Sequence, residues 1–185
     1  ITELGGSRVN WIVSLDDDDE AGYRAIRGDG RAEASDFALR MARAYPGRLH
    51  VQAVRMKDNE PRLEAFYRSW KKETKGVIIQ KYDSFAKSLS NRSVADLSPL
   101  ERYPCRHLAR DMAVLLDGTV PLCKHALEKD PEHPGRLRYH QTAGNVFTDG
   151  LASIWDRLGQ CYSQHIRAEY PKPCGQCDEY HTFNA

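Results

Sequence analysis

Two hydrophobic periodicities alternate in the first half of the chain. Residues 9–15 (VNWIVSL), 49–56 and 77–79 are rich in apolar and β-branched side chains with little alternation, which is typical of strands covered on both faces of a parallel sheet. Between them, apolar residues recur at helical spacing, first at Phe37, Met41 and Tyr45, and then at Leu63, Phe66, Tyr67 and Trp70. We expect Asn59 to cap the second helix, with Pro61 in its first turn.

Strands and helices that alternate with connections of this length predict right-handed crossovers and a parallel sheet. Three strands are few for such a sheet, so residues 1–98 are interpreted as part of a barrel or an open sheet. Residues 84–104 are rich in Ser, Asn and Arg, have weak periodicity, and are interpreted as the connection between the two halves.

The second half, residues 99–185, has a different pattern. Residues 112–116 predict a strand, Asp117-Gly118 a tight turn, and residues 119–122 the antiparallel partner, so a β-hairpin is expected. A helix should follow, capped by Thr148 or Asp149, with one face formed by Leu151, Ile154, Trp155, Leu158, Cys161, Tyr162 and His165. The predicted fold class is therefore α/β: about three parallel strands with helices, then a small α+β domain with a hairpin and a helix.

Composition and charge narrow the functional classes. Lys and Arg total 27 against 26 for Asp and Glu, so the net charge of +1 gives no field that would select nucleic acid or a membrane surface. We also find no apolar run of the roughly 20 residues that a membrane-spanning helix needs. The expected protein is globular and cytoplasmic.

All five cysteines lie in the second half. An odd number without secretory features argues against a closed disulfide framework, and metal ligation becomes the leading interpretation. Cys174-Gly175-Gln176-Cys177 places two thiolates on one tight loop, and strand pairing would bring Cys105 and Cys123 together at the ends of the expected hairpin. Four thiolates suit zinc or one iron-sulfur cluster. Cys161 falls on the apolar face of the last helix and is interpreted as a buried core thiol.

Other interpretations of the cysteines stay open. Five free thiols without metal are one, and a catalytic dithiol formed by Cys174 and Cys177 is another, although Pro171 and Pro173 precede the pair where a redox motif would follow a strand. A closed zinc site in a structural or interaction module is a third. His107, His125 and His140 could substitute as ligands.

Taken together, these motifs resemble the SPASM pattern of radical S-adenosylmethionine enzymes. The similarity rests on Cys105, twelve residues, Gly118, four residues and Cys123, on Cys174-x-x-Cys177, and on the segments Gly144-Asn145-Val146 and Leu151-Ala152-Ser153-Ile154-Trp155. A full SPASM domain has further cysteines after the CxxC pair, and none follows Cys177 here. The shorter twitch variant fits better and implies one auxiliary 4Fe-4S cluster, with Cys105, Cys123, Cys174 and Cys177 as ligands.

The resemblance extends to the first half, which is similar to the C-terminal part of the radical enzyme barrel. By that analogy Ser14 and Asp16 approach the ribose of S-adenosylmethionine, and Arg27 its carboxylate. The CxxxCxxC motif that binds a second 4Fe-4S cluster does not occur here and is expected upstream of Ile1. The chain is thus expected to be inactive alone, and the full-length enzyme to modify a peptide or small molecule with electrons from a donor protein.

Several of these residues also have interpretations without a functional role. Asp16 could begin a solvated acidic run and Arg27 could pair on the surface. The run Asp16 to Asp19 lacks the spacing of a calcium loop, so a solvated loop is favoured over a cation site. Trp70 and Trp155 are both expected in the core.

Overall fold

The computed structural model describes residues 9–96, 101–133, 135, 137–139, 141–172 and 174–177. The chain divides into two compact units, one comprising Ile1–Tyr82 with Arg92–Val94 and the other Asp83–Asn91 with Ala95–Ala185. The predicted boundary after residue 98 lies outside the described residues and stays a prediction. Among the described helices, none is long and apolar enough to cross a membrane.

The first unit is a three-stranded parallel sheet with helical connections, as the sequence predicted. The sheet order is β1-β2-β3, and Val13 of β1 aligns with Val51 of β2, which aligns with Val77 of β3. In chain order the elements are β1 (Trp11–Ser14), α1 (Glu20–Arg27), α2 (Arg31–Ala44), β2 (Leu49–Arg55), the 3-10 turn η1 (Glu60–Arg62), α3 (Leu63–Glu73) and β3 (Gly76–Lys81). Helix α1 was not separated from α2 in the sequence pattern.

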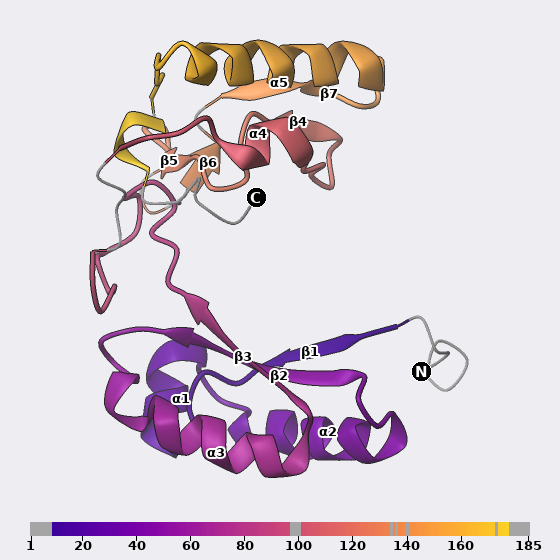
Figure 1. Ribbon diagram of the computed structural model, residues 1–185, viewed down its shortest axis with the longest axis vertical. Helices are drawn as coiled ribbons and strands as arrows, with labels where there is room; N and C mark the ends of the chain where they lie inside the picture. The colour runs from indigo at the N-terminus through magenta and orange to yellow at the C-terminus, as the bar shows by residue number, and fades with distance from the viewer. Residues whose placement is uncertain are drawn as a thin grey trace. The chain divides into compact units, whose positions relative to one another are not determined.

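The three helices of the first unit lie on the same side of the sheet (Figure 1). Leu49, Val51 and Ala53 of β2 point to this side and are buried, together with Phe66 and Trp70 of α3, which confirms Trp70 as a core residue. The opposite side of the sheet carries both apolar and polar side chains, among them Ile12, which is 57% exposed, and Gln52 and Gln80, which are hydrogen-bonded to each other at 2.8 Å. The strands are therefore packed on one face only, whereas their apolar runs predicted burial on both.

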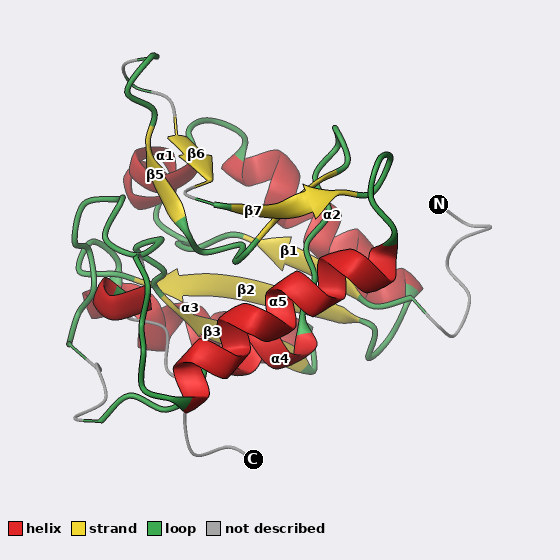
Figure 2. Ribbon diagram, turned by 90° about the horizontal axis from the view of Figure 1, so that it is seen from above, coloured by secondary structure: helices red, strands yellow, loops and turns green. Residues whose placement is uncertain are grey.

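Apart from the long helix α5, the second unit is built from short elements. In chain order its elements are α4 (Arg106–Arg110), β4 (Thr119–Pro121), β5 (Leu127–Lys129), β6 (Leu137–Tyr139), β7 (Thr142–Asn145), α5 (Leu151–Ile166) and the 3-10 turn η2 (Cys174–Gln176). Strand β4 pairs antiparallel with β7, and β5 pairs antiparallel with β6. Helix α5 runs beside β7 (Figure 2), and Ile154 and Leu158 of this helix pack with Val120 and Ala143.

The expected hairpin between residues 112–116 and 119–122 is wrong in its pairing. A tight turn does form at Asp117-Gly118, where the Leu115 amide donates to the Thr119 carbonyl at 2.9 Å. Beyond that turn β4 pairs with β7 instead, so residues 112–116 form no strand and Val114 and Leu116 are exposed. The β4–β7 pairing wins because it buries Val120 against α5.

Helix α5 differs from expectation at its start and on its apolar face. Its N-cap is Gly150 without a side-chain cap, and Asp149 instead accepts a hydrogen bond from the Asn145 amide at 2.9 Å. Trp155 is 42% exposed and Leu151 61%, so the assignment of Trp155 to the core is wrong. A two-stranded sheet covers only a narrow stripe of the helix, and Trp155 lies one residue, about 100°, away from that stripe.

Candidate iron-sulfur site and the loop after the first strand

The acidic loop after β1 is only partly solvated, because Asp16 and Asp17 are buried, Asp18 is half-buried and Asp19 is exposed, which corrects the favoured interpretation of residues 16–19 as a solvated loop. Asp16 and Asp17 are each 2% exposed. One Asp16 oxygen accepts from the Val54 amide and the other from the Arg27 Nε, both at 2.6 Å. The structure therefore brings Asp16 and Arg27 together as an ion pair at the carboxyl end of β1, with both Asp16 oxygens already engaged.

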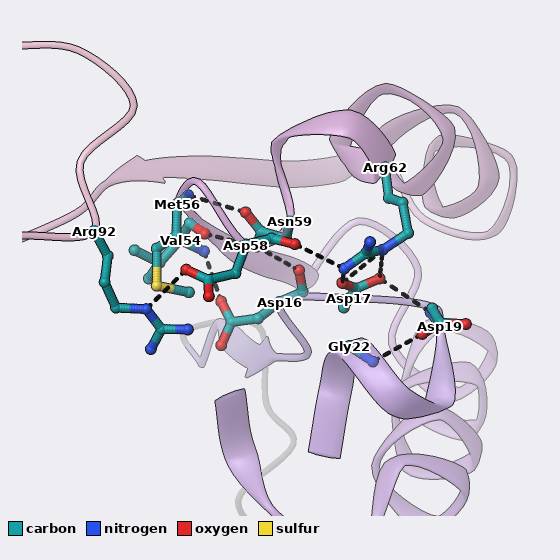
Figure 3. A network of polar contacts seen from close by, with 10 residues as sticks. All are labelled: Asp16, Asp17, Asp19, Gly22, Val54, Met56, Asp58, Asn59, Arg62 and Arg92. Carbon is teal, nitrogen blue, oxygen red and sulfur yellow. Dashed lines mark hydrogen bonds and ion pairs between the residues drawn. The ribbon is translucent and has the colours of Figure 1, made fainter. Parts of the chain in front are cut away.

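The other three carboxylates of the loop also have defined partners, and Figure 3 shows those of Asp17 and Asp19. Asp17 accepts from the Arg62 Nε at 2.9 and 3.0 Å, and Asp19 caps α1 by accepting from the Gly22 amide at 2.8 Å. Asp18 accepts from the Trp70 indole at 2.7 Å, and burial raises the pKa of this carboxyl above its ordinary value. The loop thus fastens β1 to α1 and to the segment before α3.

Asn59 joins this network and does not cap α3. Its side chain is fully buried and donates to the carbonyls of Asp16 at 2.8 Å and Val54 at 2.9 Å, while its oxygen accepts from the Met56 amide at 2.9 Å. Ser14 ends β1, where it aligns with Gln52. Contacts of Ser14, Asp16 and Arg27 with S-adenosylmethionine stay predictions.

Replacing Asp17 by alanine should lower the free energy of unfolding by about 2 kcal/mol, because a buried carboxylate that bonds a guanidinium and a backbone amide is lost. Asp29→Ala is the matched control, since Asp29 also pairs with an arginine but its side chain is 86% exposed, and we expect a loss below about 0.5 kcal/mol. Denaturant unfolding followed by tryptophan fluorescence measures both. Equal losses would show that the buried network does not stabilise the fold.

The cysteines of the second unit are held by different elements. Cys105 precedes α4, is buried, and its amide donates to the His165 Nδ1 at 3.3 Å. Cys123 follows β4, and its sulfur accepts from the His125 amide at 3.4 Å. Cys174 and Cys177 lie in and after η2, where the Cys177 amide donates to the Cys174 carbonyl at 3.2 Å.

The thiol groups lie close enough to affect one another electrostatically. Burial raises the pKa of Cys105 to about 11, and the charges of Cys177 and Cys161 add to this. Burial also raises the pKa of Cys123 to about 11, with Cys105 contributing. A hydrogen bond to Cys161, then burial, raises the pKa of Cys174, on which Cys105 and Cys123 also act. These electrostatic interactions link Cys105 with Cys177, Cys123 and Cys174, and Cys123 with Cys174.

Cys161 is buried, as expected, and packs with Cys105 and Leu108. Its hydrogen bond with Cys174 was not foreseen, and this bond, together with His165, lowers the pKa of Cys161. The fifth thiol thus borders the proposed site from the core. Within the described ranges, no group of three or more His, Cys, Asp or Glu side chains is arranged to hold a single metal ion.

The histidines considered as substitute ligands are bound to carboxylates. The His107 Nδ1 lies 2.6 Å from the Asp111 Oδ2, and the His125 Nδ1 contacts Asp83. The two imidazole rings lie near each other, with centroids 5.1 Å apart. His140 lies outside the described residues.

The conformation of Gly118 explains why a glycine is needed between Cys105 and Cys123. Its φ is +79°, and an added Cβ would lie 2.4 Å from the Phe147 ring and 2.6 Å from the Asn145 Oδ1. Asn145 in turn donates from its side chain to the Asp117 carbonyl at 2.8 Å. The turn that leads into β4 and Cys123 therefore requires a residue without a side chain.

Gly118→Ala should destabilise the second unit by about 1–3 kcal/mol, because the side chain meets both a positive φ and a close contact. Gly159→Ala is the matched control. Gly159 lies inside α5 with nothing within 4 Å of an added Cβ, so alanine there should stabilise by up to about 1 kcal/mol. Opposite signs in thermal or denaturant unfolding are expected, and a stabilising Gly118→Ala would refute this explanation.

Three residues that order the site were missed by sequence reasoning. Arg102 donates to the carbonyls of Cys174 and Cys177, Tyr170 donates to the Arg102 carbonyl, and His165 accepts from the Cys105 amide. Only His165, on the apolar face of the predicted helix, gave any signal. Arg102 and Tyr170 carry no local pattern, since their partners lie 68 to 75 residues away.

Comparison with known proteins supports the iron-sulfur interpretation. Residues 105–178 match the model of the SPASM family, an iron-sulfur cluster-binding domain, which supports a SPASM-type domain in the second unit and does not favour zinc. The chain is also 43% identical over 183 residues to a protein of Treponema pallidum (strain Nichols) described as uncharacterized. That match covers 95% of this chain but 48% of the relative, so the chain spans about half of that protein's length. No solved structure gives a significant match.

Proposed function

We propose that the chain is the C-terminal portion of a radical S-adenosylmethionine enzyme and that its second unit holds one auxiliary 4Fe-4S cluster. Cys105, Cys123, Cys174 and Cys177 would each bind one iron. The observation that carries this proposal is the match of residues 105–178, which contain all four of these cysteines, to the SPASM family. The cluster would supply electron transfer or structural support.

The thiols fit such a group chemically. Cys105 and Cys123 have pKa values near 11 because they are buried, so at neutral pH both are protonated without a metal. Only the thiolate form ligates, and a cationic metal centre favours that form. Because each thiolate binds a different iron, the four sulfurs would surround a whole cluster and need not converge on a single ion, in contrast to a closed zinc site.

The first unit supports the barrel part of the proposal. Its three parallel strands carry helices on one side only, while Gln52 and Gln80 lie on the opposite side, which in a barrel would face the interior. Arg27 is held by Asp16 at the carboxyl end of β1, and its side chain is 38% exposed, which would allow it to bind the carboxylate of S-adenosylmethionine. Asp16 would then act by orienting Arg27.

The relative's greater length is compatible with an upstream region that supplies the CxxxCxxC motif and a second cluster. The substrate class implied by the SPASM resemblance is a peptide, with small molecules as the alternative, and the reaction would draw on an electron donor protein in the cytoplasm. The cluster proposal is tested by anaerobic purification with iron and sulfide analysis. About four irons and four sulfides per chain are expected, whereas stoichiometric zinc under iron-replete conditions would contradict the proposal.

A further inference from the structure

Arg102 binds the backbone of the CxxC turn at two points. Its Nη1 donates to the carbonyl oxygen of Cys174 at 3.1 Å and to that of Cys177 at 3.0 Å. These carbonyls belong to the two residues whose sulfurs are the proposed ligands. Hydrogen bonds from a charged donor are stronger than those between neutral groups, so one guanidinium nitrogen holds both ends of the turn.

Arg102 is itself held in place by a residue that follows α5. Its carbonyl accepts from the Tyr170 hydroxyl at 2.7 Å, and the Tyr170 and His165 rings form a T-shaped contact with centroids 4.9 Å apart. His165 accepts from the amide of Cys105, which lies three residues after Arg102. This chain of contacts connects three of the four proposed ligands, Cys105, Cys174 and Cys177.

We propose that Arg102 is a positioning residue of the cysteine site with two effects. It holds the CxxC turn in the conformation that presents both sulfurs, and it places a permanent positive charge beside the bound cluster. The first effect concerns the chain alone, whereas the second rests on the proposed function. A cluster with four thiolates is anionic, and a nearby fixed cation stabilises its reduced form and raises its reduction potential.

The first effect is tested in the metal-free, reduced 185-residue chain. In Arg102→Gln, iodoacetamide should alkylate Cys174 and Cys177 about tenfold faster than in the wild type. Loss of hydrogen bonds from a charged donor should change the population of the ordered turn by roughly a factor of ten. Cys123 in the same chain serves as the internal reference and should not change. Arg167→Gln is the matched control, because Arg167 lies in the same unit, is exposed, and pairs only with the neighbouring Glu169 among its described contacts.

The second effect is tested after anaerobic cluster loading. Arg102→Gln should lower the reduction potential, whereas Arg102→Lys should keep it near that of the wild type, because lysine keeps the positive charge. The shorter and more flexible lysine side chain should hold the two carbonyls less firmly. Arg102→Lys should still raise the alkylation rate, and it keeps the test decisive if the glutamine variant does not fold. If the Arg102 variants are alkylated no faster than Arg167→Gln, Arg102 does not hold the CxxC turn. An unchanged reduction potential in Arg102→Gln would overturn the charge effect. A wild-type chain that binds no iron would refute the proposed function instead, and the alkylation test would still show whether Arg102 holds the CxxC turn.

Discussion

Cys174→Ala is expected to remove most of the bound iron, while Cys161→Ala retains it. Both thiols are close together and hydrogen-bonded, so the two variants change neighbouring atoms with opposite predicted effects. Cys174 lies on the CxxC turn that Arg102 fastens, where its loss removes a ligand. Cys161 packs in the core with Cys105 and Leu108, so its loss should cost about 1 kcal/mol of packing and leave the ligand set complete.

Iron and sulfide content after identical anaerobic loading measures this difference. Circular dichroism of each variant controls for folding. Equal loss of iron in both variants would show that Cys161 is a ligand and not a core thiol, and retention of iron in Cys174→Ala would remove Cys174 from the ligand set.

Removal of the cluster is expected to make the second unit less stable without unfolding it, and to leave the first unit unchanged. The first unit has a core of ten buried residues around a parallel sheet, whereas the second relies on two-stranded sheets with strands of three or four residues and on two small clusters of buried side chains. Such small cores rarely stabilise a domain without a disulfide, a bound metal or a similar cross-link. Binding free energy for a group that the unfolded chain cannot hold becomes folding free energy.

Hydrogen exchange measured with and without an iron chelator tests this prediction. Peptides from residues 105–177 should lose protection in the chelated sample, while peptides from residues 11–81 should keep it. Unchanged protection of the second unit would show that a cluster bound by the cysteines does not stabilise this unit. Loss of protection in both units would mean that the two do not fold independently.

The first unit was largely predictable because its signals are local. Continuous apolar runs marked the three strands, and the spacing of Phe66 and Trp70 marked α3. The acidic loop was misjudged because the partners of Asp17 and Asp18, which are Arg62 and Trp70, lie 45 and 52 residues away. Residue type alone predicted solvent, and only the tertiary structure supplies the partners that make burial of these carboxylates favourable.

In the second unit, the spacing of cysteine and glycine predicted more than the strand pattern did. The Asp117-Gly118 turn forms as expected, but β4 pairs with β7, more than twenty residues further along the chain. The pattern around residues 112–116 could not show that a distant strand would compete. The four cysteines were selected as candidate ligands because thiolates at that spacing have few alternative uses, whereas Arg102 acts through its side chain on backbone carbonyls and leaves no such signature.

The central claim is that sulfurs of Cys105, Cys123, Cys174 and Cys177 bind one multi-iron group. Iron X-ray absorption of the anaerobically loaded chain tests it most directly. We predict an iron environment of sulfur neighbours with a short iron–iron distance, lost together with the iron in Cys174→Ala. Iron surrounded by oxygen or nitrogen without an iron–iron distance, in a chain whose four thiols remain freely alkylated, would contradict it.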